Sequence, residues 1–149
     1  MRVLCSRPSE LLQLSQSREV EFFGARDGAT MTCDPLLVLH ATTEAAGLTH
    51  RTTCRGDDGS AALLERTVRG RETIAVGGRQ VEVVRVSIDT KLTGRTTGSA
   101  HDELWLLATN GLTVRWDRQV DTVADAAFGA RVRYREDASF VLESLEPAT

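Results

Sequence analysis

The sequence lacks the short motifs that accompany most catalytic and cofactor sites. It has no glycine-rich dinucleotide or phosphate loop, no Gly-x-Ser-x-Gly nucleophile motif and no His-Glu-x-x-His zinc motif. The three cysteines, Cys5, Cys33 and Cys54, form no Cys-x-x-Cys pair and lie near no cluster of histidines, so the spacing of a zinc site is absent. We therefore expect no metal, no cofactor and no enzymatic activity.

Long apolar runs and a strong net charge are missing as well. No segment reaches the roughly 18 apolar residues of a membrane-spanning helix, and residues 1–10 lack the apolar stretch of a signal peptide. Lys91 is the only lysine, and the net charge is only −3, which indicates neither nucleic acid nor a membrane surface as a partner. We expect no membrane span. The residues leave open a cytosolic protein, the mature piece of an exported protein or a fragment of a longer precursor. If the chain is the C-terminal part of such a precursor, we expect an extracytoplasmic location, secreted or in the cell envelope.

The chain does contain enough apolar material for one folded domain. It has 149 residues, of which 41% are hydrophobic and 26% charged, as in an ordinary globular protein. Apolar and polar side chains alternate with a period of two along most of the chain, which is the pattern of half-buried strands. Two-residue hairpin turns are expected at Gly77-Gly78 and at Asn110-Gly111.

These patterns predict a single all-β domain over residues 1–149, an antiparallel meander of about nine strands with little helix. Such a number of strands in one flat layer would leave a whole face exposed to water. We therefore expect the sheet to curve strongly into a half-barrel or to close into a barrel, with a sandwich as the remaining alternative.

Five segments give weaker signals. Leu11–Ser17 alternates as a strand, although a short helix is the competing interpretation. Gly24–Gly28 is predicted to be a turn, and the polar segment Thr90–Ala100 a turn or a water-facing edge. Val120–Phe128 is predicted to be a connection with one short helical turn. Arg131–Arg135 is predicted to be a strand with its apolar side chains inward and its arginines outward.

If the sheet bends, an apolar cavity is expected on its concave face. Alternation within two strands assigns six side chains to this face as the candidate ligand-lining set. These residues are Val84, Val86, Ile88, Leu112, Val114 and Trp116. Tryptophan is also a common core residue, so the alternative for Trp105 and Trp116 is that both simply fill the interior.

Polar clusters are few. His101, Asp102 and Glu103 form the only adjacent acid–base cluster that includes a histidine, and a hydrolase using His101 would need a nucleophile close by. The competing interpretation is a polar beginning of a strand. Asp57-Asp58 lacks the alternating oxygen ligands of a calcium loop, so a solvated turn is expected. The arginines near the C-terminus are interleaved with acids, which indicates a solvated sheet face.

The cysteines leave two interpretations open. Cys33 and Cys54 could form a disulfide in an exported protein, or all three cysteines could be buried thiols. A disulfide there would close a loop of roughly 20 residues and contribute on the order of 3 kcal/mol. Cys5 would then be left unpaired.

Five segments are considered together: Glu21–Gly24, Met31–Pro35, Val68–Thr73, Asp102–Leu106 and Gly111–Arg115. In this order they resemble a group of uncharacterised exported proteins of high-GC Gram-positive bacteria. In that group the cysteines matching Cys33 and Cys54 pair, and a signal peptide and further strands come before the matching region. The hairpin pattern Trp-Leu…Gly-Leu-x-Val-Arg is also similar to one in envelope proteins of the lipoprotein-carrier half-barrel type, which bind lipid-like ligands on a concave apolar face.

Taken together, these features lead us to expect a non-enzymatic envelope or secreted domain. Its curved sheet would bind an apolar small molecule or lipid, or a partner protein. The first alternative is a structural or interaction module with a filled core, for example a homodimer joined through an exposed strand edge. The second alternative is a hydrolase using His101.

Overall fold

The protein is a single antiparallel sheet. The computed structural model describes residues 2–7, 10–22, 25–41, 45–125 and 129–145, with only the backbone described for residues 2–4, 6–7, 16–22, 25–28 and 40–41. Nine strands follow one another in the sheet in chain order, and each pairs antiparallel with the next. They are β1 (Arg2–Arg7), β2 (Glu10–Phe22), β3 (Ala25–Ala41), β4 (Thr49–Gly56), β5 (Ala61–Val76), β6 (Arg79–Thr93), β7 (Thr96–Leu107), β8 (Thr113–Asp125) and β9 (Arg131–Val141).

The predicted all-β meander is thus confirmed, and Leu11–Ser17 is strand rather than helix. The sheet is open, because β1 and β9 are its two edges and the described strands do not close into a barrel. The described residues also contain no helix whose length and hydropathy would let it cross a membrane.

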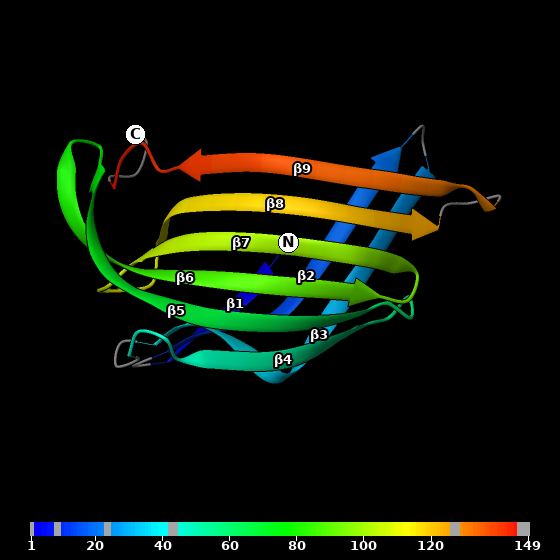
Figure 1. Ribbon diagram of the computed structural model, residues 1–149, viewed down its shortest axis with the longest axis horizontal. Coiled ribbons are helices and arrows are strands. Elements are labelled where there is room, and N and C mark those ends of the chain that lie inside the picture. The colour runs from blue at the N-terminus through cyan, green and yellow to red at the C-terminus, as the bar shows by residue number, and fades with distance from the viewer. Residues whose placement is uncertain (1, 8–9, 23–24, 42–44, 126–128, 146–149) are drawn as a thin grey trace.

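The strands lie in two crossing groups. In Figure 1, β4 to β9 run side by side, and β1 to β3 pass behind them at an angle. Side chains of β3 pack with those of β5, β6 and β7 in one buried cluster, so we call the face of β5–β9 that turns toward β1–β3 the inner face. The opposite side is the outer face. The buried members of this cluster are Cys33, Leu37, Leu39, Cys54, Ala62, Leu64, Val68, Val84, Val86, Ile88, Leu104 and Leu106.

The exposure of one row of side chains across the inner face shows how far the N-terminal strands cover this face. Directly opposed residues on β5 to β9 are Val68, Val86, Leu104, Trp116 and Phe140. Val68 and Val86 are 1% and 0% exposed, Trp116 is partly buried, and Phe140 is 53% exposed. The interior is therefore closed at β5 and β6 and opens toward the β9 edge.

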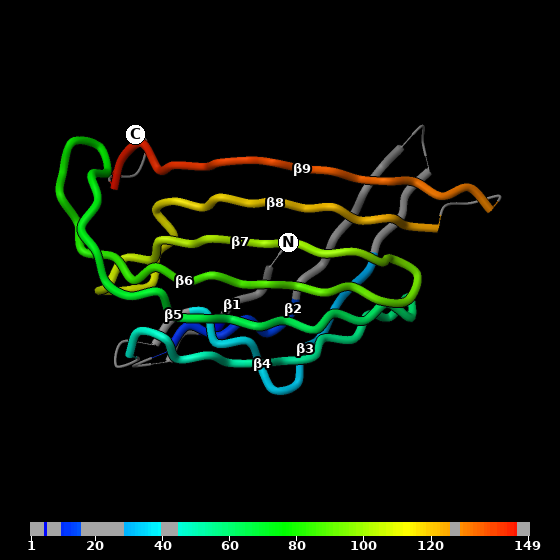
Figure 2. Tube along the Cα trace, in the orientation of Figure 1, coloured from blue at the N-terminus to red at the C-terminus, as the bar shows by residue number. Residues whose placement is uncertain are grey.

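A second, smaller cluster lies at one end of the sheet. Val76, Val83, Trp105 and Val114 are buried there against the C-terminal segment around Leu142. The hairpin between β5 and β6 extends to this segment (Figure 2). At its tip is the predicted two-residue turn Gly77-Gly78, where Val76 pairs with Arg79 and both glycines have positive φ, 56° and 78°. A Cβ on Gly77 would lie only 2.7 Å from the carbonyl oxygen of Glu143, so this close approach requires glycine.

Several local predictions are wrong. Residues 25–28 belong to β3 and pair with β2, so they are not part of a turn, while Gly24 lies outside the described residues. Thr90–Ala100 does contain a turn, at Gly94 and Arg95, but its other residues end β6 and begin β7, which are central strands and not an edge. Residues 120–125 continue β8, so the helical turn predicted at Val123–Ala127 is wrong over residues 123–125, while residues 126–128 lie outside the described residues. At residues 90–100 and 120–125, pairing with neighbouring strands on both sides outweighs a polar or alanine-rich local sequence, whereas residues 25–28 pair with β2 alone.

Two predictions about the last strands need correction as well. Asn110-Gly111 lies within a longer connection over residues 108–112, not in a two-residue turn, and Gly111 has φ 74°. Arg131–Arg135 is part of β9, but Val132 and Tyr134 are 49% and 44% exposed instead of buried. They lie on the edge strand, where no further strand covers them.

Candidate functional site

An apolar pocket lies between the two groups of strands. We call it the leucine pocket; its volume is about 450 Å³. Leu39 of β3, Leu104 and Leu106 of β7 are buried in its wall, and Leu11 of β2 is partly buried. Leu112, in the connection between β7 and β8, also lines the pocket and is 47% exposed. The remaining lining residues are Asn110, Gly111 and Thr113.

The connection between β7 and β8 is held by its own hydrogen bonds. The amide nitrogens of Leu107 and Gly111 donate to the carbonyl oxygens of Leu112 and Leu107, each at 2.8 Å. The Oδ1 of Asn110 accepts from the amide of Leu112 at 3.0 Å. Asparagine side chains close such turns onto the residue two positions later. Leu112 is therefore fixed at the pocket despite its exposure.

An apolar stripe leads from the pocket to the β9 edge. Leu104 in the pocket wall lies directly opposite Trp116, and the Trp116 ring stacks on Phe140 with centroids 5.4 Å apart. Trp116 Nε1 donates to Asp102 Oδ1 at 2.7 Å, and Arg118 Nη1 donates to the same oxygen at 3.1 Å. The indole is thus oriented by its polar end, while its ring stays part of the inner face.

The predicted ligand-lining residues do not form one surface. Val84, Val86 and Ile88 share the inner face but are buried in the main cluster, outside the lining of the leucine pocket. Leu112 does line the pocket. Val114, however, packs with Trp105 in the second cluster, whereas Trp116 packs against the main one.

A register shift explains this split. The pairing of β7 with β8 slips between Trp105 and Leu106, so that Leu106 pairs with Thr113 and Trp105 with Arg115. An extra residue on one strand reverses the alternation that follows it. The expectation that Leu112, Val114 and Trp116 face one side is therefore wrong. The sequence also gave no indication that Leu11 and Leu39 would reach this end of β7, because that contact joins segments distant in the chain.

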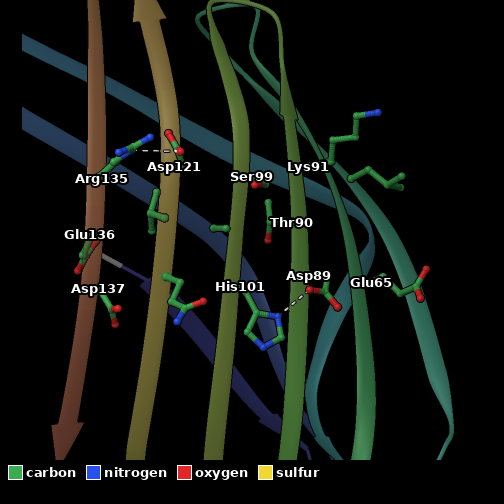
Figure 3. Close-up of a pocket in the computed structure, with 14 residues that line it drawn as sticks. Glu65, Asp89, Thr90, Lys91, Ser99, His101, Asp121, Arg135, Glu136 and Asp137 are labelled. Atoms are coloured by element: carbon green, nitrogen blue, oxygen red, sulfur yellow. Dashed lines mark hydrogen bonds and ion pairs between the residues drawn. The ribbon is translucent and has the colours of Figure 1, made fainter.

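His101 lies on the outer face, in a shallow polar groove of about 780 Å³ across β5 to β9 (Figure 3). Its Nδ1 is 2.6 Å from Asp89 Oδ1, and its Nε2 is 3.5 Å from Glu103 Oε1. Glu103 also accepts from Arg85 Nε at 2.7 Å, and this hydrogen bond raises the pKa of Arg85. Asp102 points to the inner face instead. The three adjacent residues therefore do not lie on one face, and both ring nitrogens of His101 face carboxylates rather than a hydroxyl.

The C-terminal arginines are neutralised within the outer face. Arg115 Nη2 is 2.7 Å from Asp117, and Arg133 Nη2 is 2.5 Å from Asp121, which also accepts from Arg135 at 3.3 Å. The hydrogen bond from Arg115 lowers the pKa of Asp117, and the one from Arg133 lowers the pKa of Asp121. These pairs agree with a solvated face rather than an anion-binding patch.

The predicted disulfide is confirmed. Cys33 and Cys54 lie opposite each other on β3 and β4, are bonded, and are both buried, while Cys5 is a free thiol. In the turn at residues 56–59, Asp58 accepts from the amide and hydroxyl of Ser60, each at 2.9 Å. Among the described residues no group of three or more histidines, cysteines or acids could hold a metal ion.

Comparison with protein-family models, with curated protein sequences and with solved structures gives no match to this chain. The functional argument therefore depends on the geometry above.

Proposed function

We propose that this protein is a non-enzymatic domain of the cell envelope or of a secreted protein that binds an apolar, lipid-like ligand in the leucine pocket. The observation that carries the proposal is a pocket of about 450 Å³ with five leucines in its wall. This volume lies within the range of roughly 300–1,000 Å³ typical of small-molecule sites. A leucine wall favours an alkyl chain, because such a wall offers burial of apolar surface and few hydrogen bonds.

The opening of the inner face toward β9 supports the same function. A chain longer than the pocket would continue along Trp116 and Phe140, which are stacked and only partly covered. A half-barrel curvature of the sheet, as in the lipoprotein-carrier proteins that the hairpin resembles, would enlarge this concave surface. The buried disulfide supports an extracytoplasmic location, since disulfides persist in oxidising compartments.

Fluorescence quenching by a long-chain fatty acid brominated on its alkyl chain tests this proposal. Bromine quenches tryptophan on contact, and the two tryptophans lie on opposite faces. In Trp105→Phe the remaining Trp116 lies opposite Leu104 of the pocket wall, so we expect saturable quenching. In Trp116→Phe the remaining Trp105 lies between the guanidinium groups of Arg85 and Arg115, at 5.2 and 4.4 Å, so we expect no quenching. The unbrominated acid serves as the control.

A pair of leucine substitutions makes the test specific to the pocket. Leu112→Asp places a charge at the pocket, and we expect the affinity for the acid to fall roughly tenfold or more, since burying one leucine is worth about 2 kcal/mol. Leu63→Asp is the matched control, because Leu63 is equally exposed at 49% but lies in the outer groove. Equal loss in both variants, or no saturable quenching of Trp116, would rule out a ligand in the leucine pocket.

A further inference from the structure

The edge strand β9 is long and regular. It has eleven residues, is the last strand in the sheet order and pairs with β8 over its whole length without a register shift. Figure 1 shows it along one margin of the sheet. Natural edge strands are usually short, bulged or interrupted by proline, because a free edge can pair with another strand. β9 has none of these features, although it does carry charges.

The backbone groups at this edge belong to the odd-numbered residues. The amide of Leu142 donates to the carbonyl oxygen of Val114 at 2.8 Å, on the β8 side. Backbone groups of successive residues in a strand point to alternate sides. Even-numbered residues of β9 therefore pair with β8, and the odd-numbered residues from Arg131 to Val141 present their amides and carbonyls to the free edge.

We infer that a second copy of this chain adds its β9 antiparallel to this edge, with the two-fold axis at Glu136. In this register Arg135 of each copy lies opposite Asp137 of the other, and Arg133 lies opposite Ser139. The opposed odd-numbered residues would then form the pairs with backbone hydrogen bonds between the two copies. A two-fold axis makes each contact occur twice, so one complementary pair yields two ion pairs.

The charges within one chain favour this partner. Arg133 and Arg135 share a single carboxylate, Asp121, whereas Asp137 is exposed and takes part in no ion pair or hydrogen bond with the described residues. Pairing with a second copy would give Arg135 its own carboxylate and would give Asp137 a cation. Opposite charges directly across a strand pair are stabilising, and like charges are destabilising.

The same charges disfavour the neighbouring registers. Shifting the second strand by two residues in one direction places Arg135 opposite Arg135, although Arg133 then lies opposite Asp137, and shifting it in the other direction places Asp137 opposite Asp137. Among these three registers, only the central one pairs opposite charges without placing like charges opposite each other among the odd-numbered residues. The central register also places Glu136 opposite Glu136. The repulsion between these two carboxylates is reduced within each chain, because Glu136 accepts from Arg118 at 3.3 Å and from the Tyr134 hydroxyl at 2.9 Å.

The inner face of the edge adds apolar contacts. Val132 and Phe140 are 49% and 53% exposed, and the proposed register brings Val132 of one copy opposite Phe140 of the other. Aromatic side chains paired with β-branched ones stabilise antiparallel strands. Val132 and Phe140 would therefore each gain an apolar partner in the dimer.

Charge reversal tests the interface. Sedimentation velocity of the wild-type chain should show a concentration-dependent dimer, and Arg135→Asp or Asp137→Arg should each raise its dissociation constant roughly tenfold or more. The double variant Arg135→Asp/Asp137→Arg should restore dimerisation, because it exchanges the two charges. Circular dichroism checks that each variant retains its sheet. Monomers at all concentrations, or single variants that dimerise like the wild type, would overturn the inference.

Cross-linking tests the register independently. In a Cys5→Ser background, Glu136→Cys should form a disulfide-linked dimer on mild oxidation, since residue 136 faces itself in a pair without backbone hydrogen bonds, where Cα atoms approach to about 4.5 Å. Ala138→Cys is the matched control, because residue 138 lies opposite Tyr134 and not itself. Equal cross-linking of both cysteines would contradict the proposed register. Neither experiment involves the leucine pocket, so their failure would leave the ligand proposal standing.

Discussion

The two ends of the inner face are built from similar side chains but are in different surroundings. At β5 and β6, Val68 and Val86 are fully covered by the N-terminal strands and belong to the main cluster. At β9, Phe140 continues the same row but is more than half exposed. The difference arises from coverage and not from composition, because both positions are apolar and both face inward.

This contrast separates stability from binding within one face. Residues at the covered end contribute to the free energy of folding through buried area and close packing. Residues at the open end bury little area in the isolated chain, so an apolar side chain there has surface left for a ligand or a second copy. The leucine pocket lies between the covered end and the open end of the inner face.

The largest expected effect is a difference in stability loss between truncating a covered apolar residue and truncating an exposed one. Ile88→Ala removes a side chain that is 4% exposed in the main cluster, and we expect a loss of about 2–5 kcal/mol in the free energy of unfolding. Phe140→Ala should cost less than about 1 kcal/mol, because its side chain already contacts water. Urea unfolding of both variants with the disulfide intact measures the difference. Similar losses would mean that β9 is covered as well as β6.

The next largest effect concerns how the N-terminal strands, which cover the inner face, are attached to the rest of the sheet. β3 and β4 pair at only four positions, Met31 to Asp34, and the Cys33–Cys54 disulfide lies within this short ladder. Replacing both cysteines with serine should lower the free energy of unfolding by about 3 kcal/mol. We also expect weaker binding of the brominated acid, because the covering strands form one wall of the leucine pocket.

The control for this effect is Cys5→Ser, which removes the free thiol and leaves the disulfide in place. It should leave stability and binding nearly unchanged. A double serine variant as stable as the wild type would mean that the short β3–β4 ladder needs no covalent support.

The sequence predicts the strand pattern because it depends on local information. The Cys33–Cys54 disulfide joins two strands, so the residues alone leave it as one of two interpretations, and the resemblance to exported proteins indicates the pairing. Alternation with a period of two identifies a strand wherever one side is buried. Gly77-Gly78 identifies a hairpin turn, because glycine readily adopts the positive φ angles that such a turn requires. The prediction fails at residues 120–125, because their sequence, Val-Asp-Thr-Val-Ala-Asp, does not alternate strictly between apolar and polar side chains. Local propensity there is outweighed by pairing on both sides.

The leucine pocket could not be predicted from local sequence patterns. The alternation of Leu112, Val114 and Trp116 is real, but a register shift at Trp105/Leu106 turns Val114 to the other face. Leu11 and Leu39 reach the pocket only through the crossing of the N-terminal strands over β7. A contact between distant segments leaves no periodic signal in either of them.

The smallest expected effect is a dependence of stability on pH that originates on the outer face of β8. Ion pairs with Arg115 and Arg133 hold the pKa of Asp117 and of Asp121 below the ordinary value of 3.8. A carboxyl whose pKa is lowered by folding stabilises the native state above its unfolded-state pKa, and this contribution is lost as the pH falls through the folded-state pKa. The free energy of unfolding should therefore decline below about pH 4.

Comparison of Asp121→Asn with the wild type measures that decline. Asparagine keeps the size of the side chain but cannot ionise, so the variant should show a shallower fall in stability with acid. The effect should be small and should shrink further in salt, because Asp121 and Arg133 are both largely exposed and exposed ion pairs are screened. A steep, salt-independent decline in Asp121→Asn would place the acid sensitivity elsewhere.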